Sequence, residues 1–155
     1  MRFIKLENIL YIWALNYFAL SALLHWRLHP DLGLLFYFIG SVIGLHLLSA
    51  LEYFILSTVN SSIPTKSPLK SIVLQLLLIP VTLFILTSTG SRLGAGIVLQ
   101  LNLEFLFWQW NTFKKQGTLA NWWNGTLTIS VKQQQYYLYA LAAVFLLETS
   151  LFVLI

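Results

Sequence analysis

The chain has 155 residues, of which 58% are hydrophobic and only 9% are charged, with a formal net charge of +4. A soluble domain carries roughly 25% charged residues, so this composition excludes a water-soluble fold and requires lipid to cover much of the surface. The absence of cysteine excludes disulfides, thiol catalysis and cysteine-ligated zinc or iron–sulfur centres. The length fits a single domain over residues 1–155, and the positive charge fits loops beside anionic lipid rather than a nucleic-acid partner.

Five apolar stretches follow one another, each close to the ~20 residues that a helix needs to cross a bilayer. They cover residues 4–24, 34–57, 68–87 (or 71–87), 93–110 and 136–155. Backbone groups in lipid must be hydrogen-bonded within their own segment, so each stretch is expected to be helical. Pro80 lies inside the third stretch and is expected to kink it. The sequence therefore predicts an all-α, polytopic integral membrane protein, a bundle of about five transmembrane helices.

The positive residues fall mainly on one side of these predicted spans. Seven of them share the side that holds the N-terminus and the loops after the second and fourth spans: Arg2, Lys5, Lys66, Lys70, Lys114, Lys115 and Lys132. The other side holds only Arg27 and Arg92. Cytoplasmic loops retain Lys and Arg, so we expect a cell-membrane protein with a cytoplasmic N-terminus and an outer C-terminus. The first span is expected to act as an uncleaved signal anchor.

Four polar residues lie near the middle of predicted spans: Asn16, His46, Glu104 and Glu148. At 1.5 Å per residue each is roughly 15–18 Å from an end of its span, so all four are expected at mid-membrane, facing the bundle interior. Glu104 is expected to have His46 or Glu148 as its neighbour. With Gln100, one turn before Glu104, these are the candidate ligand- or ion-binding residues. The alternative is that they form interhelical hydrogen bonds that hold the bundle together, with the glutamates protonated.

The fourth stretch is the most polar of the five. Its polar residues occupy two faces, with Gln100, Glu104, Trp108 and Asn111 on one and Asn102 and Gln109 on the other. A helix with two polar faces is expected to lie centrally, with little contact with lipid. In the second stretch, Gly40 and Gly44 form a GxxxG pattern, which predicts close packing against another helix because glycine lets two backbones approach.

Motifs for metal, cofactor or catalysis are weak or missing. His25 and His29 have the i, i+4 spacing of metal ligands on a helix, but Pro30 ends the helix there, which favours two solvated loop histidines. No phosphate-binding glycine loop, HExxH motif or nucleophile elbow is present. The sequence therefore predicts no metal site and no cofactor, and it assigns no catalytic residue.

One stretch resembles part of a known family. Residues 99–108 are similar to the glutamine–asparagine–tryptophan helix of the tryptophan-rich sensory proteins, and five spans with six tryptophans also suit that family. However, the family's first loop is rich in Trp and Pro, whereas residues 25–33 contain one of each, and the similar stretch lies in the fourth span rather than the third. The sequence therefore assigns no family.

These features favour a non-enzymatic accessory subunit or packing component of a membrane complex, because the short loops leave almost no mass outside the membrane. The alternative is a small transporter or ligand-binding bundle that uses the mid-membrane polar residues. The expected partners are the lipid bilayer and either another membrane protein chain or a second copy of this one.

Overall fold

The computed structural model describes residues 11–13, 15–16, 32–58, 71–119 and 129–154. These residues are almost entirely helical, and they include no strand. The first predicted span lies outside the described residues except for two short helical pieces, residues 11–13 and 15–16. The expectation of an all-α protein is confirmed for the described part of the chain.

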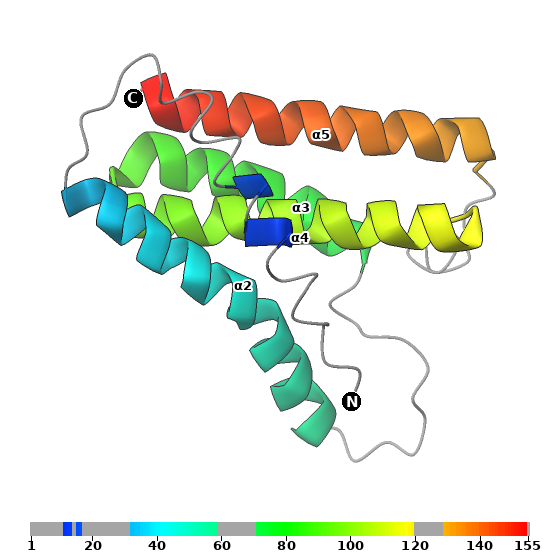
Figure 1. Ribbon diagram of the computed structural model, residues 1–155, viewed down its shortest axis with the longest axis horizontal. Helices are drawn as coiled ribbons and strands as arrows, with labels where there is room; N and C mark the ends of the chain where they lie inside the picture. The colour runs from blue at the N-terminus through cyan, green and yellow to red at the C-terminus, as the bar shows by residue number, and fades with distance from the viewer. Residues whose placement is uncertain (1–10, 14, 17–31, 59–70, 120–128, 155) are drawn as a thin grey trace.

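Four long helical segments make up the described structure (Figure 1). They are α2 (Leu32–Thr58), α3 (Ile72–Phe84), which continues as the π-helical turn η1 (Ile85–Thr89), α4 (Arg92–Gln116) and α5 (Val131–Leu154). In Figure 1, α4 and α5 lie side by side and run in opposite directions. The first half of α2 crosses the beginning of α4, and α2 then diverges from α4. The central helix is α4, which contacts α2, α3, η1 and α5.

Local hydrogen bonds set where these helices begin. The Ser71 side chain accepts a hydrogen bond from the backbone N–H of Leu74, at 3.2 Å, and the Ser91 side chain accepts one from that of Gly94, at 3.0 Å. Each serine satisfies a donor that has no partner within the helix, so it favours a helix start at the next residue. Between the two helices, Gly90 adopts φ 59°, a left-handed conformation that glycine tolerates, and this ends η1.

Two helices extend beyond the apolar stretches. The helix α4 continues six residues past the predicted end at 110, and α5 begins five residues before the predicted start at 136. Gly117, at φ 68°, caps the end of α4 through its N–H to the Phe113 carbonyl. Ser130 and Gln133 form a reciprocal pair of backbone-to-side-chain hydrogen bonds, a capping box that begins α5.

The contact between α2 and α4 is close enough that backbone meets backbone. A Cβ atom placed on Gly40 would overlap the carbonyl oxygen of Leu93, and one on Gly44 would lie 2.7 Å from that of Ile97. From the other side, a Cβ on Gly96 would overlap the carbonyl oxygen of Tyr37. Glycines on both helices therefore allow this crossing, and the inner face of α2 that carries Gly40 and Gly44 packs against α4.

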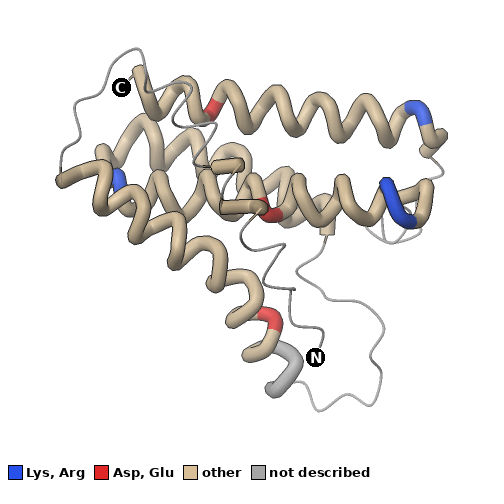
Figure 2. The backbone as a smooth tube through the Cα atoms, viewed as in Figure 1, with Lys and Arg blue, Asp and Glu red and all other residues tan. Residues whose placement is uncertain are grey.

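Three described helices are long and apolar enough to cross a membrane, namely Leu32–Phe54, Ile72–Thr89 and Val131–Leu154. These helices could place the protein in a membrane. The helix α4 is too polar to be among them, and it lies in the middle of the others. Figure 2 shows Lys and Arg at the helix ends, and Asp and Glu along the helix lengths. A charge in the middle of a bilayer is costly, so basic residues at the ends suit helices that span one.

Candidate functional site

Buried polar side chains concentrate around α4. Gln100, Asn102, Glu104 and Gln109 are each less than 10% exposed, although they occupy different faces of the helix. The two polar faces of α4 therefore meet other helices, as the central position of α4 requires. Because apolar surroundings penalise a polar group that lacks a hydrogen bond, the partners of these side chains decide what they do.

One group, here called the Asn16 cluster, joins α4 to α2 and to residue 16. It consists of Asn16, Tyr37, Ser41 and Gln100, all 1% exposed or less. The Tyr37 hydroxyl donates to Asn16 Oδ1 at 2.8 Å, and Asn16 Nδ2 donates to Ser41 Oγ at 3.3 Å and to Gln100 Oε1. Asn16 therefore uses all of its side-chain donors within this cluster, and it accepts one hydrogen bond. Gln100 Nε2 has no hydrogen-bond partner among the described residues.

A second group, the Glu148 cluster, joins α3, α4 and α5 on the other side of α4. Asn102 Nδ2 donates to Thr82 Oγ1 and to Glu148 Oε2, each at 2.8 Å. The Thr82 hydroxyl in turn donates to the Leu78 carbonyl at 2.8 Å. One amide thus ties three helices together, which is the use that membrane helices often make of Asn and Gln.

A small cavity lies beside the Glu148 cluster. It measures about 10 Å³, and its lining includes Gln75, Asn102 and Glu148. The Glu148 carboxyl is 2% exposed, and its Oε1 has no hydrogen-bond partner among the described residues. A cavity of ~10–15 Å³ has room for about one water molecule, which needs two to four polar partners. The site is therefore the right size and polarity for a single buried water, and it is too small for a larger solute.

A third set, the Tyr137 layer, lies two helix turns from the Glu148 cluster along α3 and α4. The Tyr137 hydroxyl donates to Gln75 Oε1 at 2.9 Å and accepts a longer hydrogen bond from Gln109 Nε2 at 3.5 Å. Seven residues separate Gln75 from Thr82 on α3, and seven separate Asn102 from Gln109 on α4. The two layers therefore repeat one pattern of contact between the same three helices.

The sequence-predicted residues do not form one site. Glu104 is fully buried, and it lies twelve residues from either end of α4, which is about 18 Å. It is two residues from Asn102, or about 200° around the helix, so it points away from Glu148. Asn16 and Gln100 are brought together, whereas Glu148 pairs with Asn102 on the opposite side of α4.

His46 was expected to face the interior, and this expectation is wrong. The side chain is exposed, because the inner face of α2 is occupied by Gly40, Gly44, Leu45 and Leu48, which are all buried. At 100° per residue, His46 falls on the opposite side of the helix from Gly44. His46 is therefore not the neighbour of Glu104 that the depth argument suggested.

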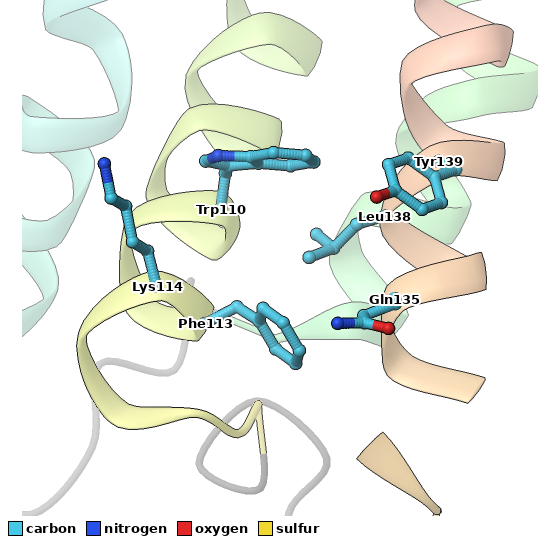
Figure 3. Close-up of a pocket in the computed structure, with 6 residues that line it drawn as sticks. All are labelled: Trp110, Phe113, Lys114, Gln135, Leu138 and Tyr139. Atoms are coloured by element: carbon cyan, nitrogen blue, oxygen red, sulfur yellow. The ribbon is translucent and has the colours of Figure 1, made fainter. Parts of the chain in front are cut away.

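The sequence did not point to a groove between the end of α4 and the start of α5, which has a volume of about 480 Å³. Its lining is Trp110, Phe113 and Lys114 from α4, and Gln135, Leu138 and Tyr139 from α5 (Figure 3). The rings of Trp110 and Tyr139 meet edge to face, with centroids 6.0 Å apart, so they connect the two helices at this end. The available signal was the i, i+4 spacing of Trp110 and Lys114 and of Gln135 and Tyr139, once both helices are extended.

The described residues contain no group of three or more His, Cys, Asp or Glu side chains placed to hold a metal ion. The polar side chains that do converge are mostly amides and hydroxyls, which bond one another across helices. The chain matches no protein-family model, no curated protein and no solved structure.

Proposed function

We propose that this chain is a five-span cell-membrane protein, with its N-terminus in the cytoplasm, that acts as a non-enzymatic accessory subunit of a membrane complex. The carrying observation is the exposure of His46 near the middle of α2, on a helix apolar enough to span the bilayer. A histidine that faces hydrocarbon has no hydrogen-bond partner there, which is unfavourable. A transmembrane helix of another protein would cover the imidazole and supply that partner.

The residues around His46 suit such a contact. One stripe along the outer face of α2, here called the His46 stripe, consists of Val42, His46, Ser49, Ala50 and Tyr53, all exposed. They follow the spacing of a single helix face. Ser49 and Ala50 are small enough for another helix to come close, and the two hydroxyls with the imidazole can hydrogen-bond across the contact. The partner is therefore expected to present a polar side chain opposite His46.

The charge distribution supports the proposed orientation. Lys114 and Lys115 lie in the last turn of α4, and Lys132 lies in the first turn of α5, so three cations share the end where these helices meet. Arg92 begins α4 and lies at the opposite end. Under the positive-inside rule the lysine end faces the cytoplasm.

The polar interior supports a packing role over a transport role. In the Asn16 and Glu148 clusters, the amides of Asn16 and Asn102 donate their hydrogen bonds to side chains of other helices. The cavity beside Glu148 has room for about one water, whereas a transported solute needs a path of solute size. The alternative, a transporter or ligand-binding bundle that uses these polar residues, would require the helices to separate around Glu148.

Site-specific photocrosslinking in the cell's own membranes tests the proposal. A crosslinking residue at position 49, in the His46 stripe, should give one discrete adduct with a different protein. A crosslinking residue in place of Leu147, which is 69% exposed on α5, should give only lipid adducts. Because an interhelical hydrogen bond contributes about 0.6–1.7 kcal/mol, His46→Leu should weaken the adduct roughly 3- to 20-fold, while Val42→Leu on the same face should not. Lipid adducts alone at position 49, or an adduct between two copies of this chain, would overturn the accessory role.

A further inference from the structure

The groove between α4 and α5 combines three kinds of surface. Trp110 and Tyr139 are 44% and 58% exposed, so their rings remain available although they touch each other. Leu138 is buried and Phe113 half-buried, which gives the groove apolar walls. Lys114 is exposed, and its side chain extends along the side of α4 that faces away from α5 (Figure 3). The lining therefore combines a flexible amine at the outer edge with two amphipathic rings and hydrocarbon.

This combination matches the boundary between the hydrocarbon core and the headgroups of a bilayer. Trp and Tyr favour that boundary because one end of each ring is apolar and the other is polar. The groove occupies the lysine end of α5, an apolar helix of 24 residues, so it falls where a span would leave the membrane. Lipid is therefore the molecule that surrounds it at high concentration.

We propose that this groove binds one anionic phospholipid, with its phosphate at Lys114 and its glycerol and first acyl carbons against Trp110 and Tyr139. The charge of the groove selects an anion, because Lys114 is the only charged residue among its described lining residues, and Lys115 and Lys132 lie at the same end. A zwitterionic headgroup would bring its own ammonium next to these lysines.

The size and shape of the groove fit this ligand. A volume of about 480 Å³ is within the ~300–1,000 Å³ of small-molecule sites, enough for a headgroup and the upper part of the acyl chains. Gln135, exposed on α5, can donate its amide N–H to a phosphodiester or ester oxygen. Cytoplasmic leaflets carry the anionic lipids, which agrees with the proposed orientation of the lysine end.

Native mass spectrometry of the purified protein in detergent tests the inference, with phosphatidylglycerol and phosphatidylcholine added in equal amounts. We expect one phosphatidylglycerol to be retained in preference to phosphatidylcholine. Lys114→Gln should weaken its retention about tenfold or more, because a direct hydrogen bond to a charged group contributes about 1.5–3 kcal/mol. Lys115→Gln is the matched control, since it removes the same charge from the same helix end without touching the groove. It should change retention by less than twofold.

Three results would overturn the inference. Equal loss in Lys114→Gln and Lys115→Gln would mean that general attraction to a positive surface holds the lipid. Equal retention of both lipids would mean that the headgroup charge is not recognised. Displacement of the lipid by glycerol phosphate alone would mean that the site binds free phosphate rather than a lipid. The outcome is independent of the accessory role, because the groove lies between α4 and α5, whereas the His46 stripe lies on α2.

Discussion

Replacing Gly40 with alanine is expected to destabilise the protein strongly. The added methyl group would overlap the Leu93 carbonyl oxygen, which belongs to the backbone of α4 and cannot rotate away. Separating the two helices would give up their packing, so we expect a loss of about 1–3 kcal/mol in the free energy of unfolding. Alanine gains ~1 kcal/mol over glycine inside a helix, which offsets only the lower end of this range.

Gly33→Ala is the matched control on the same helix. The three heavy atoms nearest to its methyl group would all belong to the exposed Arg92 side chain, which can change rotamer where the Leu93 backbone cannot. We therefore expect little or no loss of stability, measured by denaturant unfolding of both variants in the same detergent. Equal stabilities of Gly33→Ala and Gly40→Ala would show that α2 and α4 do not cross at Gly40.

The second large loss of stability is expected when Asn102 is replaced with leucine. Asn102→Leu removes the hydrogen bonds to Glu148 and Thr82, and it leaves the buried Glu148 carboxyl without the donor that the structure provides. An unsatisfied buried polar group costs about 1–3 kcal/mol, and hydrogen bonds between membrane helices contribute up to about 1.7 kcal/mol, so we expect a loss of about 1–2 kcal/mol. Thr82 retains its hydrogen bond to the Leu78 carbonyl, so it adds little to the loss.

A double-mutant cycle isolates this pair. Replacing both Asn102 and Glu148 with leucine removes the unsatisfied carboxyl, and apolar pairs that replace both partners are nearly neutral. The double variant is therefore expected to unfold with a free energy closer to wild type than Asn102→Leu alone, with a coupling of about 1 kcal/mol. Strictly additive losses would show that Asn102 and Glu148 do not bond each other in the folded protein.

The sequence predicted the helical class and the approximate positions of four helices, because apolar length is a strong signal. It placed two helix boundaries five or six residues too early or too late, since residues 111–116 and 131–135 are mostly polar but helical. Helix-capping residues mark the true ends of these two helices. Ser130 and Gln133 have the spacing of a capping box, and Gly117 follows the last turn of α4, which contains two lysines. Such signals were available in the sequence, although hydropathy does not register them.

The pairing of buried polar groups was beyond the sequence. Depth along a helix is easy to count, and it brought His46, Glu104 and Glu148 to one level. Depth does not say which way a side chain points, and the rotation of α2 follows from its glycines. Once Gly40 and Gly44 face α4, His46 must face outward. The positions of these two glycines therefore predict the rotation of α2, and with it the outward direction of His46.

The helix α4 is both the most polar of the described helices and the central one. Its Gln, Asn and Glu residues leave it outside the range of apolar spans, yet it is the helix with the most neighbours. Lipid-facing helices must be apolar, whereas a helix that other helices surround exchanges hydrogen bonds with them. A polar helix between apolar ones is therefore evidence that these helices pack as a bundle.

The proposed five-span topology requires α4 to cross the membrane with its lysine end in the cytoplasm. The chain has no cysteine, so a single introduced cysteine reports one position. In intact cells, a membrane-impermeant maleimide should label Ser91→Cys, just before α4, and should label Lys115→Cys, in its last turn, only after the membrane is opened. Labelling of both positions from the same side would contradict a transmembrane α4.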